Sequence, residues 1–143
     1  MIRNIPNKYT QAMLKESIDA THKYTYDFLY LPIDFQNECN VGYAFINFID
    51  VNSVISFAKQ RIGKQWNRFN SGKVFDLTYA MIQGKHKLIA RYRNSKVMIK
   101  DESYRPKLFY SSGPRQGEEE PFPKPTNQEI LAAQRLLQMK TTS

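Results

Sequence analysis

Apolar and polar positions follow a regular order of strand-like and helix-like segments over the first 80 residues. Short runs of aromatic and branched side chains predict strands, and apolar residues spaced by three or four predict helices. Thr10 and Asp50 precede the two helical segments and are expected to cap them. The expected strands cover residues 1–5, 24–33, 41–48 and 74–80, and the expected helices cover 11–20 and 51–62. This order predicts an α+β, ferredoxin-like β-α-β-β-α-β fold with two helices on one face of a four-stranded antiparallel sheet.

The pattern continues past the fourth expected strand as a C-terminal extension. Residues 84–94 have the spacing of a third helix, whereas residues 101–125 are rich in Pro, Gly and Ser and are expected to be irregular. Thr126 and Glu129 form a capping box, which predicts a further helix over 127–139.

We therefore divide the chain into a core of residues 1–83, an extension of residues 84–125 that packs on the core, and a peripheral C-terminal helix within residues 126–143. The first expected strand begins at Met1 itself. We interpret the chain as a piece of a longer protein, because a natural chain rarely starts on a central strand.

Charge adds a candidate class of partner. The 143 residues carry a formal net charge of +8, and residues 59–107 contain thirteen Lys or Arg against three acidic residues. A concentrated positive charge is typical of proteins that bind polyanions such as nucleic acid, although a merely soluble basic surface is the alternative. No apolar run approaches the ~18 residues of a membrane span, so no membrane contact is expected. The single Cys39 excludes an internal disulfide and favours the nucleus and cytoplasm.

The third expected strand carries the most informative run, Gly-Tyr-Ala-Phe-Ile-Asn-Phe at residues 42–48. Strand alternation sends Ala44, Ile46 and Phe48 toward the helices. It sends Tyr43, Phe45 and Asn47 to the opposite, open face. Exposed rings on a basic sheet suit unstacked bases, since every base has a π-face.

Residues 41–48 resemble the longer signature of RNA-recognition motifs at all but the first of its eight positions. Residues 2–5 resemble the shorter signature on the first strand. Two departures weaken the expected binding by the sheet. Val41 stands where the signature has Lys or Arg, and Met1 stands where an aromatic ring is usual, although a thioether can also lie against a base.

The first two strands contribute further candidates for RNA contact. Alternation places Phe28 and Tyr30 on the open face, where Tyr30 is expected either to meet a base or to pack under the C-terminal extension. Arg3 falls on the same face, and its guanidinium suits a phosphate or a base.

Basic residues on the third helix are expected to lie on its exposed side. Those that we include in the candidate RNA site are Lys85, Lys87 and Arg91. A helix after the fourth strand lies either across the sheet, where it buries the rings, or beside the sheet, where it extends the basic groove. The sequence leaves both arrangements open.

Longer runs narrow the resemblance to one family. Residues 1–10, 26–35 and 40–47, with shorter matches as far as residue 123, resemble the C-terminal RNA-recognition motif of the Mei-two-like meiosis regulators of fungi and plants. The resemblance implies RNA binding in the control of meiosis, with a non-coding RNA as partner in fungal members. It assigns RNA contact to Tyr43 and Phe45.

A protein-interaction or dimerisation module is the alternative function, in which the C-terminal helix covers part of the sheet or contacts a partner or a second copy. We expect neither an enzyme nor a cofactor. No metal-ligand cluster, phosphate-binding glycine loop or nucleophile motif is present in the sequence.

Overall fold

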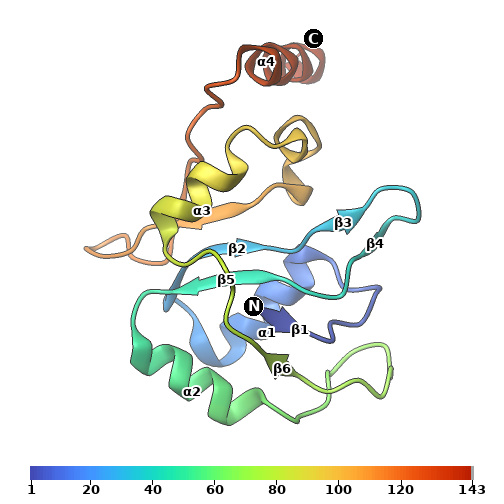
Figure 1. Cartoon of the computed structure of the whole chain (residues 1–143), viewed down its shortest axis with the longest axis vertical. Coiled ribbons are helices and arrows are strands. Elements are labelled where there is room, and N and C mark those ends of the chain that lie inside the picture. Colours follow the sequence, from blue (N-terminus) through green and yellow to red (C-terminus); the bar gives the residue numbers. More distant parts are fainter. Residues whose placement is uncertain (143) are drawn as a thin grey trace.

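The computed structural model describes residues 1–142, with the backbone alone for the last two of these. Figure 1 shows the arrangement of the elements. In chain order they are β1 (Ile2–Arg3), α1 (Gln11–His22), β2 (Tyr26–Tyr30), β3 (Ile33–Asp34), β4 (Cys39–Asn40), β5 (Phe45–Phe48), α2 (Val51–Arg61), β6 (Asp76–Leu77), α3 (Lys85–Tyr92), η1 (Lys96–Ile99), η2 (Glu102–Tyr104), β7 (Lys107–Phe109), β8 (Glu119–Glu120) and α4 (Gln128–Thr142).

The central sheet consists of two hydrogen-bonded parts that meet side by side. β1 pairs antiparallel with β6, and β5 pairs antiparallel with β2. Ile2 and Ala44 join the two parts, because each backbone N–H donates to the other residue's carbonyl, at 2.8 and 2.9 Å. The resulting order β6-β1-β5-β2 has the four antiparallel strands of the predicted α+β fold.

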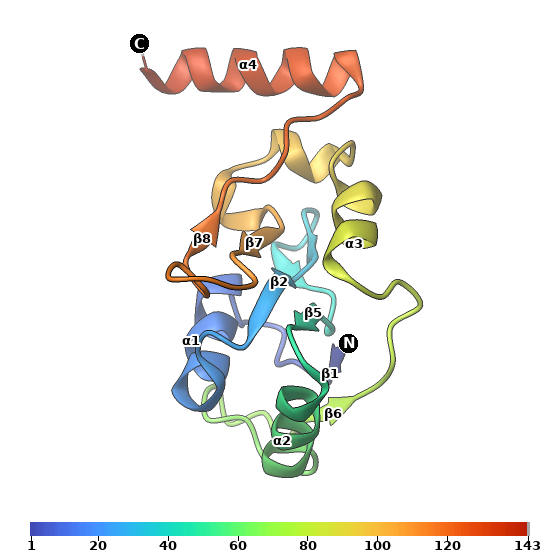
Figure 2. The same cartoon turned by 90° about the vertical axis from the view of Figure 1, so that its left-hand side faces the viewer.

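The helices α1 and α2 lie on one face of this sheet, and α3 lies on the opposite face (Figure 2). Both predicted caps are present. The Thr10 hydroxyl accepts from the backbone N–H of Met13 at 3.1 Å, and the Asp50 carboxylate accepts from that of Ser53 at 2.8 Å. The main core lies between α1, α2 and the sheet and includes Ile2, Leu14, Ile18, Leu29, Leu31 and Phe57.

The α2 helix has an unusual distribution of apolar residues. Phe57 is its buried residue and packs on Phe48 of β5, with ring centroids 5.3 Å apart. The aliphatic side chains of Val51, Val54 and Ile55 share one face of the helix, as expected from their spacing, but this face is exposed to solvent.

The prediction that residues 101–125 are irregular is wrong. This segment contains η2 and two short strands, of which β7 pairs antiparallel with β2 and β8 pairs with β7. The extension therefore continues the sheet beyond β2, and the edge of β2 that would otherwise be unpaired is covered.

The structure also settles the position of the third helix, which lies across the sheet above β2. Its apolar side chains join outward-facing residues of β2 and β7 in a second core. We call this the cover cluster, and its buried members are Phe28, Tyr30, Leu88, Tyr92, Val97, Met98 and Leu108.

The last helix is present as predicted, but its cap differs. The side chain of Asn127, not that of Thr126, accepts hydrogen bonds from the backbone N–H groups of Glu129 and Ile130, at 3.0 and 3.1 Å. The Thr126 hydroxyl instead accepts from the side-chain amide of Asn94. α4 rests on η1, where Gln134 donates to a backbone carbonyl at 2.7 Å.

Within residues 1–142 no helix is long and apolar enough to cross a membrane. The same residues contain no group of three or more His, Cys, Asp or Glu side chains placed to hold a metal ion.

Candidate nucleic-acid interface

The half of the sheet face that α3 leaves uncovered carries Tyr43 and Phe45. The Tyr43 side chain is 39% exposed, and its ring meets that of Phe45 edge to face at 5.8 Å. Ala44 points the other way and is fully buried. The alternation predicted for this run is therefore confirmed, and it leaves a ring available to stack on a base.

The half of the face above β2 is covered. Phe28 is 0% exposed, because the ring of Tyr92 stacks on it with centroids 6.0 Å apart and planes inclined by 25°. Tyr30 meets the same Tyr92 ring edge to face at 4.9 Å. Both residues lie on the predicted face of the sheet, but the expectation that Phe28 is accessible there is wrong. Tyr30 packs under the extension, which was the second of the two roles considered for it.

Phe45 stands at the boundary between the two halves. Its ring lies 6.1 Å from that of Tyr92 on the covered side and 5.8 Å from that of Tyr43 on the open side. It is partly buried against the cover cluster. One side of the ring is therefore fixed by packing, so a base that stacks there meets a preorganised surface.

The first strand provides a charged group and a thioether on the same face. The Arg3 guanidinium lies 4.0 Å from the Asp76 carboxylate of β6, and both side chains are about half exposed. An exposed pair of this kind contributes about 0–1 kcal/mol, so it does not hold Arg3 away from a ligand. Met1 is partly buried, and its carbonyl accepts from the N–H of Thr78 at 3.0 Å.

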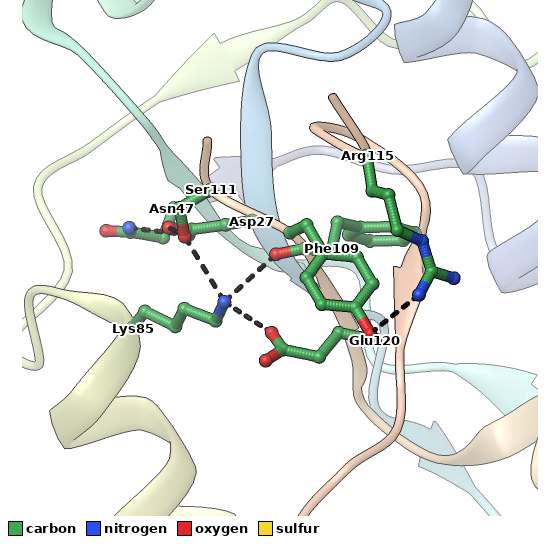
Figure 3. A network of polar contacts seen from close by, with 8 residues as sticks. Asp27, Asn47, Lys85, Phe109, Ser111, Arg115 and Glu120 are labelled. Atoms are coloured by element: carbon green, nitrogen blue, oxygen red, sulfur yellow. Dashed lines mark hydrogen bonds and ion pairs between the residues drawn. The ribbon is translucent and has the colours of Figure 1, made fainter. Parts of the chain in front are cut away.

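A polar network under α3 engages two of the predicted RNA contacts (Figure 3). The side-chain amide of Asn47 donates from its nitrogen to the buried Asp27 carboxylate at 2.8 Å. The oxygen of the same amide accepts from the backbone N–H of Gly84. The Lys85 ammonium pairs with Glu120 and donates to the Phe109 carbonyl at 3.0 Å.

The Ser111 hydroxyl completes this network. It accepts from Lys85 at 3.2 Å and donates to the second oxygen of Asp27 at 2.9 Å. The expectation that Lys85 lies on the exposed side of its helix is therefore wrong. Lys85 and Asn47 anchor α3 and the extension to the sheet.

The other two basic residues predicted on this helix, Lys87 and Arg91, are exposed. The Arg91 guanidinium carbon lies 5.2 Å from the centre of the Tyr92 ring. It therefore stands at the edge of the cover, next to the aromatic surface that stays open.

The predicted site residues do not include Tyr92, Tyr79 or Met81. Tyr92 is one of the buried residues of α3, and helical spacing alone does not show that its ring separates the covered rings from the open ones. Tyr79 and Met81, in the connection from β6 to α3, are almost fully exposed. Tyr79 falls within the expected strand 74–80, but β6 ends at Leu77, so strand alternation does not predict its exposure.

The phenol of Tyr30 is strongly affected by this packing. Burial is the main cause that raises the pKa of Tyr30 to about 12, and the nearby hydroxyls of Tyr92 and Tyr43 add to the effect, while Arg91 opposes it. Burial also raises the pKa of Tyr92, which Arg91 lowers. Tyr30 and Tyr92 are therefore neutral phenols that can donate hydrogen bonds at neutral pH.

Comparison with known proteins adds an independent finding. Residues 1–93 match the family described as RNA recognition motif 2. Meiosis protein mei2 of Schizosaccharomyces pombe is 62% identical over 127 residues, which are 89% of this chain and 17% of that protein. Protein MEI2-like 1 of Arabidopsis thaliana and Protein MEI2-like 4 of Oryza sativa are each 58% identical over 127 residues, again 89% of this chain and 14% and 13% of those proteins. The chain spans less than a fifth of the length of these relatives.

Proposed function

Because the chain belongs to the RNA recognition motif 2 family, and is therefore an RNA-binding domain, we propose that single-stranded RNA lies on the uncovered half of its sheet. The observation that carries this proposal is the exposed ring of Tyr43 beside the partly fixed ring of Phe45. Arg3 on the neighbouring strand supplies a positive charge to the same surface. A protein-interaction module is not favoured as the main function.

The proposed footprint is short. Stacking contributes about 1–3 kcal/mol per base, and the open half offers two rings where a fully open sheet would also offer Phe28 and Tyr30. We therefore expect about two stacked bases, with charged groups around them holding the backbone.

Binding of a short mixed-sequence single-stranded RNA, followed by fluorescence anisotropy, tests this proposal. We expect Tyr43→Ala and Phe45→Ala each to weaken binding by about tenfold or more, since each removes one stacking surface. Val54→Ala, on the exposed face of α2, is the matched control and should bind as the wild type does. Circular dichroism establishes that each variant is folded.

Equal binding by the wild type and both ring variants would contradict the proposal, because the affinity would then arise outside the sheet. Affinity that does not change with salt would contradict the contribution of the basic residues, since neutralised phosphates release counterions.

The relatives are named for meiosis, which supports a proposal on the wider role. We propose that the domain serves a regulator of meiosis or development, that its partner includes a non-coding RNA, and that the protein acts in the nucleus and cytoplasm. Recovery of the RNA bound to the full-length protein tests the partner, and imaging of that protein tests its location. Retrieval of no enriched RNA, or exclusion from both compartments, would contradict these proposals.

A contact through the C-terminal helix is a second, subordinate proposal. α4 exposes the side chains of Leu136 and Met139, which suits self-association or a protein partner. Light scattering distinguishes the outcomes. A dimer that Leu136→Glu dissociates supports self-association, and a monomer at every concentration contradicts it.

A further inference from the structure

Three tyrosines and one arginine meet where α3 borders the open half of the sheet. Tyr30 and Phe45 are register partners on β2 and β5. The ring of Tyr92 lies 4.9 Å from that of Tyr30 and 6.1 Å from that of Phe45, and Phe45 in turn contacts Tyr43. Arg91 lies at the same border, because its guanidinium carbon is 5.2 Å from the centre of the Tyr92 ring.

The hydroxyl groups of these tyrosines have no partner within the described part of the chain. The side-chain hydroxyls of Tyr30, Tyr43 and Tyr92 form no hydrogen bond among residues 1–142, although Tyr30 and Tyr92 are only 8% and 9% exposed. The hydroxyl oxygens of Tyr30 and Tyr92 are not among the fully enclosed unpaired atoms of these residues, and Tyr43 is itself exposed. Two largely buried rings and one exposed ring thus carry unpaired hydroxyls along this border.

The chemistry of this cluster selects a negatively charged acceptor. A guanidinium has only donors, and a neutral phenol donates readily. Besides burial, Tyr92 and Tyr43 raise the pKa of Tyr30 and Arg91 lowers it, while Arg91 lowers the pKa of Tyr92 and Tyr43 raises it. Among the described residues, no carboxylate pairs with Arg91 or bonds one of these hydroxyls.

We propose that Arg91 and the hydroxyls of Tyr30, Tyr43 and Tyr92 form a subsite for one phosphate of the bound RNA backbone. The proposal rests on the RNA-binding function and adds a ligand group and a residue, Tyr92, to it. The subsite supplies a positive charge that the sheet lacks at position 41, where the RNA-recognition signature has Lys or Arg and this chain has Val41. α3 is then both the cover of one half of the sheet and one wall of the binding site for the other half.

Anisotropy titrations of the whole chain with a fluorescein-labelled, ten-nucleotide mixed-sequence RNA test the subsite. Arg91→Gln should weaken binding by about tenfold, since charge-assisted hydrogen bonds are the strong ones. It should also reduce the slope of log affinity against log salt by about 0.7, the contribution of one phosphate on a single strand. Tyr92→Phe keeps the ring and removes only the hydroxyl, so we expect a loss of about fivefold.

Arg135→Gln, which removes an exposed arginine from α4, is the matched control and should bind as the wild type does. Thermal melting shows whether each variant keeps its fold. A second set of RNAs, each with one neutral methylphosphonate linkage, identifies the ligand group. At one linkage the neutral substitution should weaken binding by the wild type, and Arg91→Gln should then cause no further loss.

Each outcome decides the proposal. In one outcome, Arg91→Gln weakens binding by the same factor for every RNA of the second set, whichever linkage is neutral. The contact of Arg91 is then to a base or sugar, and the phosphate subsite is wrong. If Arg91→Gln and Tyr92→Phe bind as the wild type does while Phe45→Ala does not, the subsite is wrong and the RNA-binding function stands. If the wild type binds no RNA, both fail.

Discussion

Single side chains on the sheet show the limit of alternation as a predictor. The pattern of β5 correctly places Tyr43, Phe45 and Asn47 on one face, because successive side chains of a strand point to opposite sides. Alternation does not show what lies above that face. Asn47 is held by Asp27 and by the backbone that leads into α3, so its amide is part of the protein's own network. Tyr43 remains exposed, and α3, which covers Phe28 and Tyr30, leaves its ring accessible.

The ion pair of Lys85 with Glu120 predicts how one side chain contributes to the stability of the fold. Lys85→Met keeps the aliphatic stem and removes the ammonium, which also bonds the Phe109 carbonyl and Ser111. We expect the free energy of unfolding to fall by about 1–2 kcal/mol, since these charge-assisted bonds are largely shielded from water. Urea denaturation followed by fluorescence measures the change.

Lys87→Met on the same helix is the control for this substitution. Lys87 is exposed, so its replacement should change stability by no more than about 0.5 kcal/mol. An equal stability for both variants would mean that the Lys85 network does not hold α3 on the sheet.

At the scale of elements, α2 shows that several apolar residues of a helix can be exposed while another, Phe57, is buried. Phe57→Ala should lower the free energy of unfolding by about 3–5 kcal/mol, because the ring is fully buried between the sheet and α1. Ile55→Ala, two residues earlier on the same helix, should change it by no more than about 0.5 kcal/mol, since Ile55 is 46% exposed. Equilibrium urea unfolding compares the two, and similar losses would contradict this orientation of α2.

The first 80 residues were predictable because their signals are local and strong. Thr10 and Asp50 cap the two helices as expected, and Leu29 and Leu31 lie in the main core while Tyr30 lies on the other face. Each of these features depends on residues that are only a few positions apart in the sequence.

The extension was harder to predict because its structure depends on distant contacts. The strands β7 and β8 have three and two residues, too few for an alternation pattern, and β7 exists through its pairing with β2 about 80 residues away. The path of α3 across the sheet depends likewise on Tyr92 meeting Phe28 and Tyr30. The capping box at Thr126 failed because Asn127 offers a competing side-chain acceptor one residue later.

At the scale of the whole molecule, the net charge overstates the cations available to RNA. Several basic side chains of the region 59–107 are bonded within the protein. Lys85 pairs with Glu120, Arg61 donates to the carbonyl of Ser17, and Arg93 donates to that of Lys124. These three cations are therefore less available to a ligand than the exposed Arg3 and Arg91.

The central claim is that RNA occupies the uncovered half of the sheet, bounded by α3. Backbone amide chemical shifts of the labelled chain, followed as single-stranded RNA is added, test it most directly. We predict the largest changes at Arg3, Tyr43 to Phe45 and Arg91, with little change along the exposed face of α2. Changes concentrated on α1 and α2, with Tyr43 and Phe45 unaffected, would contradict the account.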